Sequence, residues 1–132
     1  MKFRKLIVFL LIVLQTTAMT VTPVAAADLP DRYTKVLNVT ATAYAPGPHD
    51  NGKWGNMTHI GTTVRPGIIA VDPKVIPLGA RLYIQYADGH GAYVTAEDTG
   101  GAIKGNKIDI AMPTVADAYE FGIQKVKVYI LE

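Results

Sequence analysis

Short stretches in which apolar and polar residues alternate occupy most of the chain after residue 35, and this alternation is typical of half-buried β-strands. The first stretch, 36–44, is rich in β-branched residues and places Thr42 and Tyr44 on one face. Residues 67–72 form an apolar run that Pro73 stops. Further strands are predicted over 81–86, 92–96, 108–111 and 125–131. The pattern therefore predicts six short strands.

Two segments do not follow a strand pattern. Residues 45–63 contain several prolines and glycines and the only tryptophan, so we expect a long loop, which in a small domain often carries function. Residues 113–122 are predicted to form the one short helix, with Thr114 as N-cap and Gly122 as C-terminal stop. A helix face that includes Tyr119 is expected to pack against the strands. These elements indicate a mainly β fold, a small barrel or sandwich.

The N-terminal residues follow a different pattern. Three basic residues precede the apolar run 6–14, and small residues follow it up to Ala27, which is typical of a secretory signal peptide over 1–27. Residues 28–35 are then a short polar leader and 36–132 the folded domain. The alternative is an uncleaved N-terminal anchor, although the run is short for a membrane span. We expect a secreted protein, in the extracellular space or the cell wall, with no stable membrane insertion after processing.

Charge and composition narrow the range of functions. The chain carries 13 basic and 11 acidic residues, but three of the basic ones belong to the signal segment, which leaves the domain with a formal charge of about −1. Such a domain, without clustered lysines and arginines, is not expected to bind nucleic acid, and it offers little attraction to anionic polymers. Without cysteine, it must rely on its own apolar core. The spacings of His49, His59 and His90 match no zinc site, so we expect no metal or cofactor.

The stretch 98–109 is the strongest candidate for chemistry, because Asp98 and Asp109 lie on either side of a turn that contains three glycines. Glycines permit positive φ angles and let a ligand approach the backbone. Two neighbouring carboxyl groups that do not both ionise readily are the usual basis of acid/base catalysis. We therefore predict a catalytic loop. Its residues expected to contact a ligand are Thr99, Gly100, Gly101 and Lys104, and Thr42 of the first strand is expected to contact the same ligand.

Several motifs along the chain resemble, in family order, those of the 3D domain, a secreted bacterial module named for three aspartates. The matching stretches are 42–44, 67–73, 76–79, 98–105 and 108–109. The resemblance extends from residue 39 to residue 131. It implies a six-stranded double-psi β-barrel, the fold of the catalytic domain of membrane-bound lytic transglycosylase A and, more distantly, of expansin-like wall proteins. Its implied partner and substrate is the glycan strand of peptidoglycan.

The same resemblance assigns the three aspartates to Asp72, Asp98 and Asp109, and it aligns Asp109 with the catalytic acid of the transglycosylase. Cleavage of a glycosidic bond needs one protonated carboxyl and one ionised neighbour. Burial and the charge of Asp98 would raise the pKa of Asp109, whereas amides of the glycine turn and Thr99 would keep Asp98 charged. Asp72 would support this network or hold the sugar. We expect Asp109 to act first as acid and then as base, leaving 1,6-anhydro-MurNAc ends.

Each of these residues also has a structural interpretation. Asp98 is a common residue of tight turns, and Asp72 before a proline is a common strand exit. Tyr44 and Trp54 could stack on sugar faces or could anchor the core and the long loop. Lys104 could bind wall carboxylates or could only keep its loop soluble.

The sequence is also compatible with two other functions. Residues 98–100 read Asp-Thr-Gly, the signature triplet of aspartic proteases, but Glu97 precedes it where those enzymes have an apolar strand, and a protease would leave Asp109 unexplained. A non-catalytic, expansin-like wall-binding module is the stronger alternative. The same barrel could bind glycan while its carboxyl groups transfer no proton.

Overall fold

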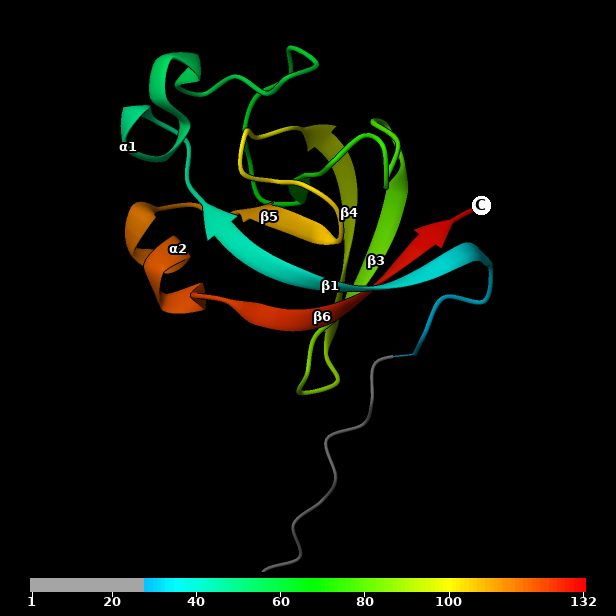
Figure 1. Ribbon diagram of the computed structural model, residues 1–132. Coiled ribbons are helices and arrows are strands. Elements are labelled where there is room, and N and C mark those ends of the chain that lie inside the picture. Colours follow the sequence, from blue (N-terminus) through cyan, green and yellow to red (C-terminus); the bar gives the residue numbers. More distant parts are fainter. Residues whose placement is uncertain (1–27) are drawn as a thin grey trace, which may run out of the picture.

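The computed structural model describes residues 28–132, in which six strands close into a barrel with the order β1-β5-β2-β4-β3-β6 (Figure 1). The strands are β1 (Tyr33–Tyr44), β2 (Ile68–Ala70), β3 (Arg81–Gln85), β4 (Gly91–Asp98), β5 (Lys107–Ala111) and β6 (Gln124–Leu131). The helices are α1 (Pro48–Asn51), the 3₁₀ turn η1 (Gly52–Trp54) and α2 (Val115–Phe121). The expected signal segment, 1–27, lies outside the described residues.

The barrel mixes parallel and antiparallel pairs. β1 runs parallel to β5 and antiparallel to β6, while β2 runs parallel to β4 and antiparallel to β5. Parallel neighbours need crossover connections, and these connections carry the long loops above one end of the barrel. Closure leaves no free sheet edge. The predicted six-stranded β-barrel of double-psi type is confirmed.

The six predicted strands are all present, with shifted ends. β1 begins at Tyr33, inside the expected leader, because Tyr33 and Lys35 pair with the end of β6. β2 is only three residues long. The predicted hairpin joins β3 to β4 through a turn in which Gly89 has φ 91°, a conformation that favours glycine.

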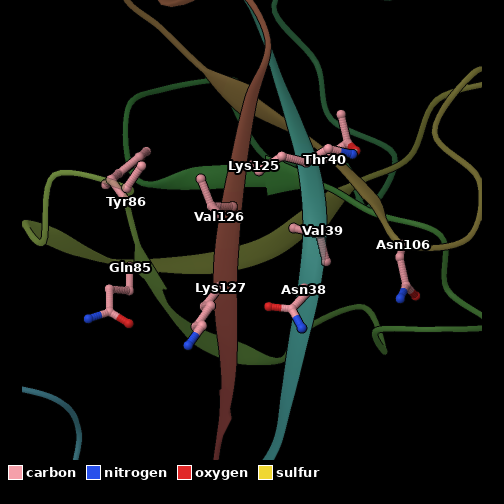
Figure 2. A pocket seen from close by; sticks show the side chains of 10 residues that line it. Asn38, Val39, Thr40, Gln85, Tyr86, Asn106, Lys125, Val126 and Lys127 are labelled. Atoms are coloured by element: carbon pink, nitrogen blue, oxygen red, sulfur yellow. The ribbon is translucent and has the colours of Figure 1, made fainter.

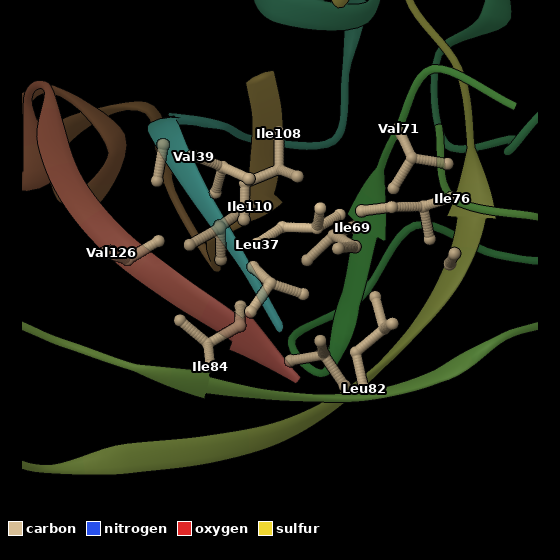
Figure 3. Close-up of a cluster of buried hydrophobic side chains, with 14 residues drawn as sticks. Leu37, Val39, Ile69, Val71, Ile76, Leu82, Ile84, Ile108, Ile110 and Val126 are labelled. Atoms are coloured by element: carbon tan, nitrogen blue, oxygen red, sulfur yellow. The ribbon is translucent and has the colours of Figure 1, made fainter. Parts of the chain in front are cut away.

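Alternate residues of the strands fill the barrel (Figure 3). This pattern follows from the period of two in a strand, which sends every second side chain inward. The buried cluster contains Leu37, Val39, Ala41, Ile69, Val71, Ile76, Leu82, Ile84, Val94, Ala96, Ile108, Ile110, Val126 and Val128. Burying each large aliphatic side chain contributes about 1.5–3 kcal/mol, which is how a domain without disulfides is stabilised.

A second, smaller cluster lies on the other face of the same strands. It contains Tyr44, Val64, Ile68, Ala70, Ile103 and Ala111. Ile68 and Ala70 alternate with the barrel residues Ile69 and Val71, so they point away from the barrel interior. This cluster attaches both long loops to the strand ends, because Val64 comes from one loop and Ile103 from the other.

The helices differ in part from expectation. α2 begins as predicted, since the Thr114 side chain accepts a hydrogen bond from the Asp117 amide, and Gly122 ends it with φ 64°. Tyr119 was expected to pack on the strands, which is wrong: it is 74% exposed, and Phe121 packs on the core instead. α1 and η1 form inside the segment expected to be a loop, so α2 is not the one helix. Among the described residues, no helix has the length and apolar character needed to cross a membrane.

Candidate active site

A hollow of about 460 Å³ opens between the long loop after β1 and the loop after β4. Its lining residues are Asp50, Asn51, Trp54, His59, Asp98, Thr99, Gly100 and Gly101. Five of them, Trp54 and 98–101, are residues that the sequence assigns to the site. The fold thus brings the tryptophan of one loop to the glycine turn of the other.

Asp98 is the last residue of β4 and is only 5% exposed. Its Oδ1 accepts hydrogen bonds from the amides of His59 and Thr99, both at 2.9 Å, and its Oδ2 accepts from the Tyr44 hydroxyl at 2.7 Å. The expected bond from Thr99 is present. The amides of Gly100 and Gly101 do not contribute; Tyr44 and the His59 amide take their place. Asp98 is therefore held in this network as a hydrogen-bond acceptor.

Tyr44 is buried in the second cluster, so its ring faces are covered and its hydroxyl is the group that acts in the site. Burial raises the pKa of Tyr44, and the hydrogen bond to Asp98 raises it further. The phenol consequently stays neutral and remains a donor to the carboxylate. Tyr44 positions Asp98 and does not offer a stacking surface.

The long loop is fixed to β4 beside this network. Arg65 Nη2 lies 2.8 Å from Glu97 Oε2, and the Glu97 side chain is almost completely buried. With the His59 amide on Asp98, two consecutive acidic residues of β4 hold the loop that carries Trp54. Glu97 is therefore structural.

Asp109 lies in the middle of β5, directly beside Thr42 of β1 in the parallel register. The Thr42 hydroxyl donates to Asp109 Oδ1 at 2.9 Å. Burial raises the pKa of Asp109, and the charges of Asp50 and Asp98 add to this increase, while the Thr42 hydrogen bond and the charge of Lys107 oppose it. The net increase favours a neutral carboxyl that can give a proton. Asp109 does not itself line the hollow.

Asp50 is an acidic residue that sequence reasoning missed. It lies in α1, lines the hollow, and its side chain is 18% exposed. Oδ2 accepts a hydrogen bond from the Ala45 amide at 2.8 Å, and Oδ1 lies 2.6 Å from His49 Nδ1. A single aspartate in a proline- and glycine-rich loop has no local signal, and only the fold brings it near Asp109, 59 residues further along.

Asp72 has a separate position in the turn after β2. Its Oδ1 accepts from the Lys74 amide at 3.0 Å and its Oδ2 from the Gly105 amide at 2.9 Å. These two hydrogen bonds lower the pKa of Asp72, with a smaller contribution from the charge of Lys104. Asp72 thus holds the end of the glycine loop and does not line the hollow. Lys104 is exposed next to it.

The glycines of the loop have different roles. Gly105 adopts φ 66°, a conformation that favours glycine, where its amide meets Asp72. At Gly100 a Cβ atom would lie 2.9 Å from Ile103 Cγ1, so the turn is packed tightly against the second cluster. Gly101 has open space around it. The expected positive φ angles are absent from Gly100 and Gly101.

Trp54 is 58% exposed at the rim of the hollow, and the Lys53 ammonium lies 5.1 Å from its ring centroid. An exposed aromatic face at the edge of a hollow is suited to stacking on a sugar ring. Among residues 28–132, no group of three His, Cys, Asp or Glu side chains has a geometry that could hold a metal ion.

Several known proteins resemble this chain in sequence or in fold. The cell wall-binding protein YocH of Bacillus subtilis is 48% identical over 100 residues, which are 74% of this chain and 33% of YocH, so the chain spans about a third of that relative. The structure of MltA from Escherichia coli superposes with a TM-score of 0.52 at 21% identity, over 58% of this chain and 27% of MltA.

An expansin from Clavibacter michiganensis, solved in complex with cellohexaose, superposes with a TM-score of 0.53 at 14% identity, over 74% of this chain and 51% of the expansin. These two structural similarities show the fold. The model of the 3D domain matches residues 67–132, half of the chain, including all three aspartates named above. The chain therefore belongs to the 3D domain family.

Proposed function

We propose that this protein is a metal-independent lytic transglycosylase that cleaves the MurNAc-GlcNAc bond of peptidoglycan. The observation that carries the proposal is the half-buried Asp109, whose raised pKa favours a neutral carboxyl next to two further carboxyl groups, Asp50 and Asp98. The fold of this chain is that of MltA, a protein described as a lytic transglycosylase. The name of YocH supports an extracellular or wall location, which agrees with the expected signal segment.

In the first step, Asp109 donates its proton to the glycosidic oxygen as the bond to C1 breaks. Positive charge then develops on the sugar ring. The negative charge of Asp98, held by three donors, and that of Asp50 would stabilise this charge electrostatically. Asp109 is left as a carboxylate, and the Thr42 hydroxyl stabilises that form.

In the second step, Asp109 removes the proton from the C6 hydroxyl of the muramic acid. The C6 oxygen attacks C1 and closes the 1,6-anhydro ring, so that the proton returns to Asp109 and no water is consumed. The role of the protein is to hold the sugar while this happens. Trp54 offers a stacking face, and Thr99, Gly100 and Gly101 line the same hollow.

A second candidate function is binding of wall glycan without cleavage. One observation favours it: Asp109 does not line the hollow in which Trp54 and Asp98 lie, so a glycan held there needs to reach the Thr42 side to meet a proton donor. The name of YocH and the expansin similarity agree with it. The aspartic protease alternative is less well supported, since both oxygens of Asp98 already accept protein hydrogen bonds.

The test is mass analysis of peptidoglycan digested with the purified protein, with an Asp109→Asn variant as control. A transglycosylase releases muropeptides with anhydro ends, and the variant does not. Ordinary reducing ends would make the protein a hydrolase. Binding with no release of muropeptides would leave the second candidate.

A further inference from the structure

A second hollow shares no lining residue with the one at the candidate active site. It has a volume of about 620 Å³ and crosses β1 and β6 (Figure 2). Its lining residues are Asn38, Val39, Thr40, Gln85, Tyr86, Ala87, Asn106, Lys125, Val126 and Lys127. Nothing in the proposed mechanism uses them.

Strand register orders the polar residues of this surface into two rows. In the first row, Lys107 of β5, Thr40 of β1 and Lys125 of β6 are direct partners. The second row contains Asn38 of β1, Lys127 of β6 and Gln85 of β3. Because the intervening Val39 and Val126 belong to the barrel core, the residues of both rows point outward. We call these six residues the basic face.

The chemistry of the basic face suits a ligand with negative charges. Among residues 28–132, no carboxylate lines the hollow. Lys125 and Lys127 are two residues apart on one strand, a spacing of about 7 Å, and amide groups from Asn38 and Gln85 flank them. Lys125 Nζ donates to Thr40 Oγ1 at 2.6 Å, which keeps its ammonium over the middle of the face. The face presents hydrogen-bond donors and positive charge together.

The basic face continues into the candidate active site. Along β1 and β5, the row after Thr40 and Lys107 is the hydrogen-bonded pair Thr42 and Asp109. One step of two residues, about 7 Å, therefore separates the lysine row from the proposed proton donor. The charge of Lys107 acts on the pKa of Asp109, which agrees with this closeness. A ligand that reacts at Asp109 can therefore contact the basic face at the same time, because both lie on the outer surface of β1 and β5.

We propose that the basic face binds the carboxylates of the acidic stem peptides of peptidoglycan, so that the protein prefers peptide-bearing strands to bare glycan. This inference rests on the proposed function, because it places the glycan at Asp109. In peptidoglycan the stem peptide is attached to the muramic acid, the sugar that the mechanism engages. Continuity with Asp109 favours this ligand over a separate phosphate-bearing wall polymer.

The experiment measures binding of the Lys125→Gln/Lys127→Gln variant to three preparations. These are peptidoglycan freed of phosphate polymers, the same material with its stem peptides removed, and walls that retain their phosphate polymers. The matched control is Arg32→Gln/Lys35→Gln, which removes the same charge from exposed positions outside the face. All proteins also carry Asp109→Asn, so that cleavage does not change the ligand during the assay.

We expect the variant to bind peptide-bearing peptidoglycan roughly three- to tenfold more weakly than the control, because two exposed ion pairs are lost. On strands without peptides, the two should bind equally. Equal binding on every preparation would overturn the inference, as would an equal loss on peptide-free strands or a loss only on walls with phosphate polymers. A single Lys127→Gln variant, which leaves the hydrogen bond between Lys125 and Thr40 in place, guards against an effect on folding.

The proposed function can fail separately from this inference. If the protein that retains Asp109 releases no muropeptides but its lysines still select peptide-bearing strands, the transglycosylase proposal fails and the basic face stands. If anhydro ends appear but the lysine variant prefers peptide-bearing strands as strongly as the control does, the transglycosylase proposal stands and the proposal for the basic face fails.

Discussion

The hollow of the candidate active site and the basic face lie on neighbouring parts of the barrel surface, yet their charged groups behave differently. Long loops cover Asp98 and partly cover Asp109, and burial shifts the pKa of Asp109. The lysines at 125 and 127 are exposed on β6. Shielding makes a carboxyl group suitable for proton transfer, whereas exposure leaves a lysine to act through its charge alone. We therefore propose that the covered region carries out the chemistry and that the open region selects the ligand.

The largest effect should come from Asp109→Asn. The amide keeps the shape of the side chain and its bond to Thr42 but has no proton to transfer, so cleavage of peptidoglycan should fall by about 10²–10⁴-fold. Release of soluble muropeptides measures this, and binding should be unchanged. A folded variant that cleaves at the parent rate would contradict the assignment of Asp109.

Tyr44→Phe should weaken the hydrogen-bond network that holds Asp98 at the hollow. It removes a buried donor from Asp98, so we expect a loss of about 1–3 kcal/mol in the free energy of unfolding, together with reduced cleavage. Urea unfolding measures the first effect. Tyr93→Phe is the control, because that tyrosine is 61% exposed and should change neither quantity. Equal stabilities of the two variants would show that the Tyr44 hydroxyl contributes little.

Thr42→Val should change the pH dependence of cleavage. The Thr42 hydrogen bond lowers the pKa of Asp109, so its removal raises that pKa further. Cleavage begins with protonated Asp109 and is lost as the pH rises through its pKa, so the alkaline limb of the pH–rate profile should move to higher pH. Thr34→Val, on the far end of β1, should leave the limb in place. A shift to lower pH would contradict the proposed role.

The smallest effect should be that of salt on binding through the basic face. Raising the ionic strength from 0.1 to 1 M shortens the screening length from about 10 Å to about 3 Å. Binding of the unsubstituted basic face to peptide-bearing peptidoglycan should weaken toward that of the Lys125→Gln/Lys127→Gln variant, while the variant should respond much less. An identical salt response in both proteins would mean that these lysines make no contact with charge on the ligand.

The sequence predicts the covered region better than the open one. The glycine turn, Trp54 and two of the aspartates have local signals, and the fold brings Trp54 and Asp98 to one hollow. Asp50 and the His59 amide have none, because their role depends on where a long loop folds back. The charge of the domain near −1 also hides the basic face, since a net charge records no separation of acidic and basic residues over the surface.

The strand pattern shows the same division. The alternation along 36–44 and 125–131 fixes which residues face the core, and the barrel confirms it. It does not show that Asn38 and Lys127 lie opposite each other, or that Thr42 lies beside Asp109, because register depends on the closed barrel. The side-chain pairs of the two sites can therefore be identified only once the pairing of the strands is known.

The most direct test of the account is a carbon NMR titration of the aspartate side-chain carboxyls in the unliganded protein. Asp109 should titrate above the ordinary aspartate pKa of about 3.9, while Asp72, held by two backbone amides, should titrate below it. An Asp109 carboxyl that titrates at or below the ordinary value would leave no neutral group to donate a proton, and would contradict the proposed mechanism.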